Sequence, residues 1–138
     1  MENDKEVYLV PKEQPQANKL YIVVRQDLRR AYQIPQSIHA KDEFTHKYPL
    51  LEKKWHEESN TLAVLGVDDT SKLLQLVDEL QAAGLKHALF YEPDVEQYTS
   101  VAIEPGLVAA ELLRELKPAG YNHKKKNKRR RRRYRPEP

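Results

Sequence analysis

The 138-residue sequence contains no cysteine, only four glycines and no long apolar run. Without cysteine the chain cannot form disulfides, thiolate nucleophiles or cysteine metal sites, and this fits a reducing compartment. The scattered glycines form no glycine-rich loop of the kind that holds phosphate groups. No segment approaches the roughly 20 apolar residues that cross a bilayer, and the polar N-terminus lacks the apolar stretch of a signal peptide. We therefore expect a soluble cytoplasmic protein.

Length and composition divide the chain into one body and two ends. A length of 138 residues and a mean hydropathy of −0.84 allow one domain with one modest core. We predict an N-terminal arm over residues 1–18 that packs through Val7–Val10, a folded domain over 19–120 and a basic tail over 121–138. The five histidines show no spacing such as His-Glu-x-x-His, so we expect neither a metal ion nor another cofactor.

The basic residues are concentrated in the tail. Ten of the 24 lysines and arginines lie between residues 124 and 135, which leaves 14 basic and 20 acidic residues before them, a net charge of −6. We expect this block to be disordered when free and to bind a polyanion, because neutralised phosphates release counterions. RNA is the expected partner, with DNA possible. The other readings are a nuclear-import signal, attraction to an anionic membrane, or binding to the acidic body. The predicted tail contacts are Lys124, Lys125, Lys126, Lys128, Arg129, Arg130, Arg131, Arg132, Arg133 and Arg135.

Short apolar runs alternate with amphipathic segments along the body. Strands are predicted at Leu20–Val24, Thr61–Val67, His87–Tyr91 and Tyr98–Ile103. The first predicted helix follows the first strand, with Pro35 in its first turn, and ends near Lys47. A second, short helix ends near His56. The third begins at an N-cap in Asp68–Ser71 and ends at Gly84, and the last covers Leu107–Leu116. This alternation predicts an α/β fold, a single-domain three-layer sandwich whose mixed four-stranded sheet has helices on both faces.

Polar residues at the strand ends are the candidates for chemistry. A carboxylate and a hydroxyl at one rim of the sheet, such as Asp94 and Thr99, could position water and polarise an ester carbonyl. Taken alone, Asp94 also reads as a turn residue after Pro93, and Thr99 as an ordinary strand residue. Gln36 and His39 lie on one face of the predicted helix, where they form either the wall of a site or a structural pair.

The order of several motifs resembles that of the peptidyl-tRNA hydrolase 2 family. The residues that carry the resemblance are Val24 to Leu28, Gln36-x-x-His-Ala40, Trp55, Ala82-x-Gly-Leu85, Glu92-Pro-Asp94, Thr99 and Ala102-Ile-Glu-Pro105. The resemblance spans roughly residues 19 to 116, almost the whole body. The resemblance implies the same α/β sandwich, a site that includes an acid and a threonine near Asp94 and Thr99, and hydrolysis of the ester between a peptide and tRNA.

One turn departs from the family pattern. Where the family has a glycine- and lysine-rich turn, with a lysine implied in activity or in holding the tRNA end, this chain has Arg29-Arg-Ala-Tyr-Gln-Ile-Pro35. Arg29 or Arg30 could replace the charge and, with Arg25, contact nucleic acid, but a guanidinium cannot act as a general base at neutral pH. Two functions therefore stay open. The chain is either a tRNA ester hydrolase, with Asp94, Thr99, His39 and Gln36 as catalytic residues, or a non-catalytic nucleic-acid-binding module. A homodimer is also possible.

Overall fold

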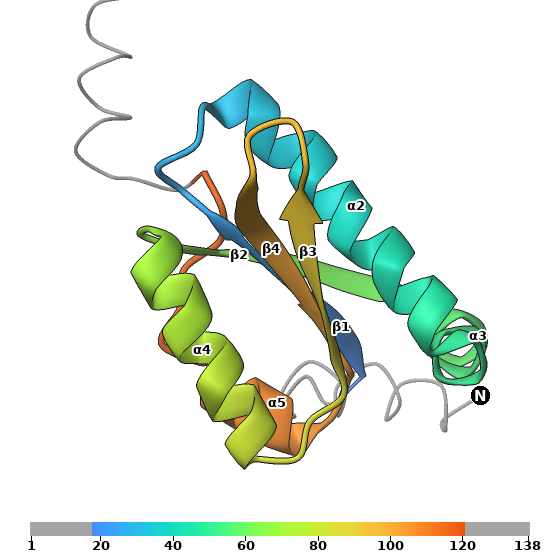
Figure 1. The fold of residues 1–138 in the computed structure, drawn as a ribbon. Helices are drawn as coiled ribbons and strands as arrows, with labels where there is room; N and C mark the ends of the chain where they lie inside the picture. Colours follow the sequence, from blue (N-terminus) through green and yellow to red (C-terminus); the bar gives the residue numbers. More distant parts are fainter. Residues whose placement is uncertain (1–17, 121–138) are drawn as a thin grey trace, which may run out of the picture.

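The computed structural model describes residues 18–120, which form one four-stranded mixed sheet with helices on both sides (Figure 1). The predicted contacts of Val7–Val10 and of the basic tail lie outside the described residues. The strands are β1 Lys19–Arg25, β2 Thr61–Val67, β3 His87–Glu92 and β4 Gln97–Ile103. The helices are α2 Arg30–Lys47, α3 Pro49–Glu58, α4 Thr70–Ala82 and α5 Leu107–Leu112.

The strand order in the sheet is β2-β1-β4-β3. β1 runs parallel to β2, and β4 lies between β1 and β3 and is antiparallel to both. A parallel pair needs a crossover, and here α2 and α3 supply it between β1 and β2. The predicted fold class is confirmed.

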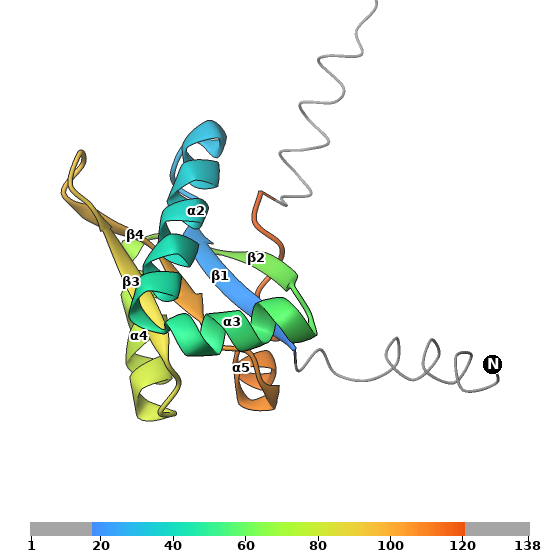
Figure 2. The same cartoon turned by 90° about the vertical axis from the view of Figure 1, so that its right-hand side faces the viewer.

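Alternate residues of β1 serve two different cores. Leu20 and Ile22 pack with Phe44 and Trp55 under α2 and α3, whereas Tyr21 and Val23 pack under α4 and α5. Figures 1 and 2 show these helix pairs on opposite faces of the sheet. Since side chains along a strand alternate between faces, a strand covered on both sides must be apolar throughout, which explains the uninterrupted run in β1.

Local signals set most of the element ends. The side chain of Asp69 caps α4 by accepting a hydrogen bond of 3.0 Å from the backbone N–H of Lys72, and Gly84 follows that helix with φ +70°. α3 runs two residues beyond its expected end at His56.

Two helices differ from the prediction. α2 begins at Arg30, so Pro35 lies inside the helix and not in its first turn. A proline there cannot donate a helical hydrogen bond, and packing of the helix face that carries Gln33 and Gln36 outweighs this loss. α5 ends at Leu112, four residues before the expected Leu116.

The end of the described chain returns to the edge of β2. The backbone N–H of Gly66 donates to the carbonyl of Lys117 and that of Ala119 donates to the carbonyl of Val64, both at 2.9 Å. Gly120 then donates its N–H to Oε1 of Gln26 at 2.6 Å. These bonds cover the half of the β2 edge that lies near the carboxyl end of β1.

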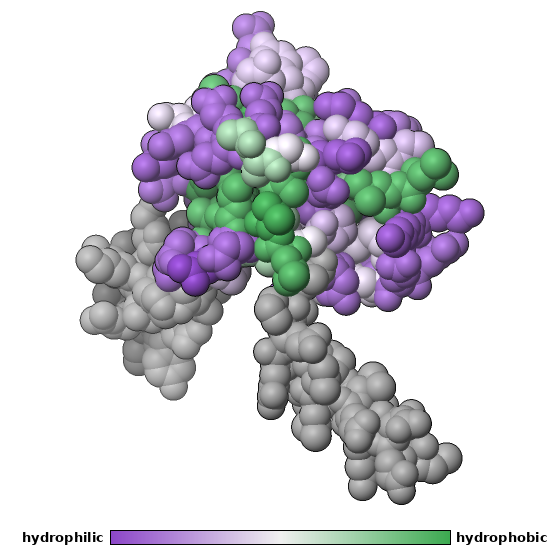
Figure 3. Space-filling model, turned by 90° about the horizontal axis from the view of Figure 1, so that it is seen from below, coloured by the Kyte–Doolittle hydropathy of each residue, from purple (hydrophilic) through white to green (hydrophobic). Residues whose placement is uncertain are grey.

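The lower face of the molecule carries hydrophobic surface, which Figure 3 shows as a band between hydrophilic regions. Leu107 and Val108 of α5, the helix at this end of the molecule in Figure 1, are exposed. Within residues 18–120 no helix is long and apolar enough to cross a membrane.

Candidate active site

One face of α2 brings three polar side chains to β3, β4 and the loop between them. Tyr32, Gln36 and His39 follow one another at intervals of four and three residues, so they share a helix face. Gln36 is only 1% exposed, while Tyr32 is half-buried and His39 is exposed. The buried glutamine is therefore the inner end of this polar row.

Gln36 binds two strands at once. Its Nε2 donates a hydrogen bond of 2.8 Å to Oε1 of Glu92, and its Oε1 accepts one of 2.5 Å from the hydroxyl of Thr99. The Ser100 hydroxyl donates to the backbone carbonyl of Gln36 at 2.7 Å. An ionised carboxylate only accepts, so the amide NH₂ must face Glu92, and the network has one consistent orientation.

A β-bulge allows Thr99 and Ser100 to bind the same residue. Consecutive strand residues normally point to opposite faces of a sheet. Here Phe90 pairs with Ser100 and Tyr91 with Tyr98, so Thr99 is the extra residue of an irregular step. Such a bulge changes the direction of a side chain, and both hydroxyls reach α2 as a result.

Glu92 connects this network to the loop that carries Asp94. Glu92 is 7% exposed, and its Oε2 accepts a hydrogen bond of 3.2 Å from the backbone N–H of Asp94. The hydrogen bond from Gln36 is the largest cause that lowers the pKa of Glu92, and the backbone N–H of Asp94 and the charge of His39 act in the same direction. Glu92 is thus an ionised anchor, while the Asp94 side chain is exposed.

The hydroxyl of Tyr32 lies close enough to Glu92 and Asp94 to be affected by their charges. Its pKa is raised, first by burial and then by the negative charges of Glu92 and Asp94. The phenol therefore stays protonated at neutral pH and remains a hydrogen-bond donor beside two carboxylates. His39 stacks on Phe90 with ring centroids 4.8 Å apart, which holds the imidazole at the β3 end of the row.

Arg25 occupies a neighbouring buried position at the end of β1. Its guanidinium donates to both carboxylate oxygens of Asp27 at 2.9 and 2.8 Å, to Oε1 of Gln97 at 2.6 Å and to the carbonyl of Tyr98 at 3.0 Å. The hydrogen bond from Arg25 is the main cause that lowers the pKa of Asp27. With a side chain only 7% exposed, Arg25 ties the end of β1 to the start of β4.

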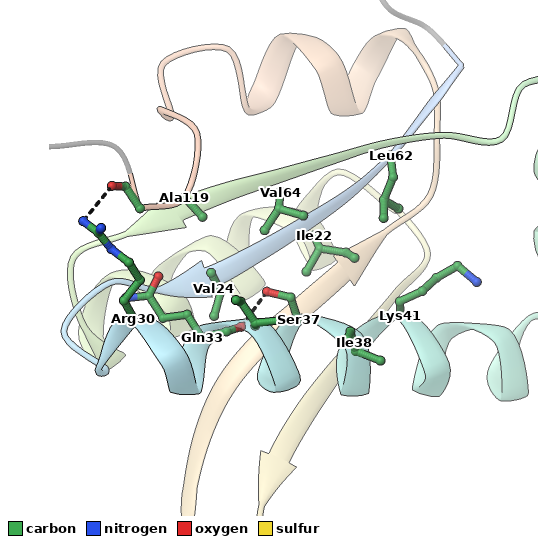
Figure 4. A pocket seen from close by; sticks show the side chains of 12 residues that line it. Ile22, Val24, Arg30, Gln33, Ser37, Ile38, Lys41, Leu62, Val64 and Ala119 are labelled. Atoms are coloured by element: carbon green, nitrogen blue, oxygen red, sulfur yellow. Dashed lines mark hydrogen bonds between the residues drawn. The ribbon is translucent and has the colours of Figure 1, made fainter.

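The arginines of the preceding turn lie elsewhere. Arg29 is exposed and precedes α2, and Arg30 lies beside Gly120, with a long 3.5 Å contact from its Nη2 to that carbonyl. Arg30 lines a groove between α2 and β2 together with residues of β1 and β2 (Figure 4). Of the predicted site residues, Gln36, Thr99 and the Asp94 loop are brought together through Glu92, with His39 beside them.

Sequence reasoning missed Glu92, Tyr32 and Ser100 as members of this site. Tyr32 could have been found from its helical spacing to Gln36 and His39. Glu92 could have been found from its position at the end of a predicted strand. Nothing local in the sequence marks the bulge that turns Thr99. Among residues 18–120, no group of three or more histidine, aspartate or glutamate side chains could hold a metal ion.

Comparison with known proteins gave one family. The model of the family described as peptidyl-tRNA hydrolase PTH2 matches residues 18–117, which is most of the chain and almost all of the described part. No curated protein sequence matches the chain.

Proposed function

This chain belongs to the peptidyl-tRNA hydrolase PTH2 family, and on that premise we propose that it hydrolyses the ester that joins a peptide or a blocked amino acid to the 3′ end of tRNA. The observation that carries the proposal is the polar row of α2 beside the Asp94 loop, held by the bonds of Gln36 to Glu92 and Thr99. Fold alone would not assign an activity, so the proposal depends on the side chains of this site.

The exposed Asp94 is the general base of the proposed reaction. Its carboxylate orients a water molecule and takes a proton from it while the water oxygen attacks the ester carbonyl carbon. Glu92 binds the backbone of Asp94 and thereby positions the loop. Gln36 and Thr99 are too deeply buried to touch substrate, and they act through Glu92 as positioning residues.

Tyr32 and His39 complete the proposed chemistry. The protonated phenol of Tyr32 donates a hydrogen bond to the carbonyl oxygen, where negative charge develops in the transition state. The ester C–O bond then breaks, and His39 supplies the proton that the departing ribose oxygen needs. The products are a free carboxylic acid and tRNA with its terminal hydroxyl, so the atoms of one water molecule are fully used.

Incubation of the pure protein with an N-blocked aminoacyl-tRNA tests this proposal. We expect release of the blocked amino acid, a loss of about 10²-fold to 10⁴-fold in Asp94→Asn, and a smaller loss in Tyr32→Phe. Glu96→Gln, at an exposed position of the same loop, is the matched control and should keep full activity. Absence of release above the Asp94→Asn background would reject the hydrolase function.

The basic tail supports a second part of the proposal, namely that residues 124–135 hold tRNA near the site. Residues 1–123 have a net charge of −6 and repel phosphate, and a cationic arm that tethers the tRNA raises its local concentration. A DNA partner and a homodimer stay predictions.

A non-catalytic nucleic-acid-binding module is the competing function. It is favoured by the absence of lysine from residues 29–35, which form the start of α2 and the residue before it. Crosslinking that recovers RNA from a protein that releases no blocked amino acid would establish this alternative.

A further inference from the structure

A groove of about 540 Å³ lies between α2 and the β1-β2 half of the sheet, on the other side of α2 from the candidate active site. Its apolar lining comes from Ile22, Val24, Ile34, Ile38, Leu62 and Val64. Figure 4 shows the side chains of β1 and β2 directed toward α2, with Arg30 at one end and Lys41 at the other.

Most of the residues that line this groove are apolar, and several of them are exposed to solvent. Ile34 and Ile38 are 64% and 61% exposed, and Leu62 is 46% exposed. The cause is the position of α2, which packs over β4, β3 and β1 and leaves side chains of β2 that line the groove uncovered by that helix. Contiguous apolar surface of this kind usually marks a binding site.

The N-terminal arm starts beside one end of the groove. The carbonyl of Asn18 accepts a hydrogen bond of 2.7 Å from the Ser59 hydroxyl, and Leu20 is paired with Leu62. Seven residues lie between Val10 and Asn18, and the eight steps from one to the other cover about 26 Å when the chain is extended. The four-residue advance from Leu62 to Gly66 along β2 is only about 13 Å. The arm can therefore turn back and reach the whole groove.

The composition of the arm matches the groove. Val7–Val10 is the apolar run of the arm, and Glu2, Asp4 and Glu6 precede it, with Lys5 as the one basic side chain among them. If the run passes back along β2, these acidic residues arrive at the Arg29-Arg30 end. Lys41, at the near end, is already paired with Glu52 at 2.9 Å, so the charge available to the arm lies at the far end.

We propose that Val7–Val10 binds in the groove of its own chain, antiparallel to β2, with Glu6 directed toward Arg30. The groove is thus a site for an extended apolar peptide with an acidic N-terminal flank. This inference does not depend on the proposed hydrolase activity, because the groove and the active site lie on opposite sides of α2.

Disulfide trapping tests the proposal in the full chain, which has no cysteine of its own. Leu9→Cys is combined with Leu62→Cys or with Ile38→Cys, since these two positions lie on opposite walls of the groove. Mild oxidation should give an intrachain disulfide in at least one pair, about tenfold faster than in the control pair of Leu9→Cys with Leu74→Cys. Leu74 is 36% exposed on α4, on the other face of the sheet. An unchanged thermal midpoint of the reduced variants verifies that they fold.

Charge reversal supplies the second arm of the test. Arg30→Glu should slow trapping several-fold, and Glu6→Lys in the same chain should restore it. Equal trapping rates for groove and control pairs would overturn the proposal. Disulfides that form only between chains, detected by mixing two differently tagged proteins, would also overturn it and would assign the groove to the arm of a second copy.

Discussion

The hydroxyl of Thr99 donates a hydrogen bond of 2.5 Å to Oε1 of Gln36, a residue 63 positions earlier in the chain, and both side chains are almost completely buried. Removal of this donor by Thr99→Val leaves a buried amide oxygen without that partner. We expect the free energy of unfolding, measured by urea denaturation, to fall by about 1–3 kcal/mol. Thr99→Ser keeps the donor and should retain the larger part of the activity. Identical activity in the valine and serine variants would contradict a positioning role for this bond.

The stability of the protein should depend on the charge of Glu92. Its folded-state pKa is lowered from the ordinary 4.5, chiefly by the hydrogen bond from Gln36. The stabilising contribution is therefore fully present above about pH 4.5 and disappears as the pH falls through the lower pKa of the folded state. The difference in unfolding free energy between the unaltered chain and Glu92→Gln should shrink as the pH falls below about 4.5.

Removal of the main donor provides the control for this pH effect. Gln36→Leu should weaken the pH dependence that the Glu92 carboxylate contributes, because the lowered pKa is first due to that amide. Stability curves of the unaltered chain and Glu92→Gln that stay parallel over the whole acid range would show that Glu92 has no such role.

Arg25 should matter for stability through the geometry of its guanidinium. A lysine cannot reproduce the bonds to Asp27, Gln97 and the Tyr98 carbonyl, so Arg25→Lys should lower the unfolding free energy by about 1.5–3 kcal/mol. Amide hydrogen exchange should rise at the start of β4. Arg114→Lys is the control, since its ion pairs are exposed and contribute at most about 1 kcal/mol. A smaller effect at Arg25 than at Arg114 would refute this assignment.

Gly66 leaves space for the side chain of Gln26, which binds the backbone of Gly120 at the end of the domain. A Cβ at this position would lie 2.1 Å from Nε2 of Gln26, whose Oε1 accepts from the N–H of Gly120. Gly66→Ala should displace Gln26 and lower the unfolding free energy by about 0.5–1.5 kcal/mol, the net value of one hydrogen bond. In a Gln26→Ala background the same change should cost little. Additive effects in this double-mutant cycle would disprove the coupling.

The tail proposal predicts a change in salt dependence. Deletion of residues 121–138 should weaken tRNA binding and reduce the slope of log K against log salt concentration by several units, because up to ten cations are removed. Hydrolysis of a small N-blocked aminoacyl ester of adenosine should be unaffected. An unchanged slope would mean that the tail does not bind the tRNA.

Local sequence predicted the elements well where local physics sets them. The apolar run of β1, the aspartate cap of α4 and the glycine after it each impose a conformation on their own neighbours, and all appear in the structure as expected. Pro35 was misplaced because its local preference for a helix start was outweighed by packing of α2 over the sheet. The predicted helix at α5 was longer than the observed one because the periodicity of its apolar residues continues beyond the last helical turn.

The sequence alone determined that this chain is an α/β sandwich of the PTH2 family, since periodicity, caps and motif order are written into neighbouring residues. Only the tertiary structure decided which side chains meet. Insertion of β4 between β1 and β3, and the bulge at Thr99, join Gln36 to Glu92 and Thr99 and turn Arg25 inward. Such contacts depend on strand order and register, which are set by the free energy of the whole fold and leave no local pattern.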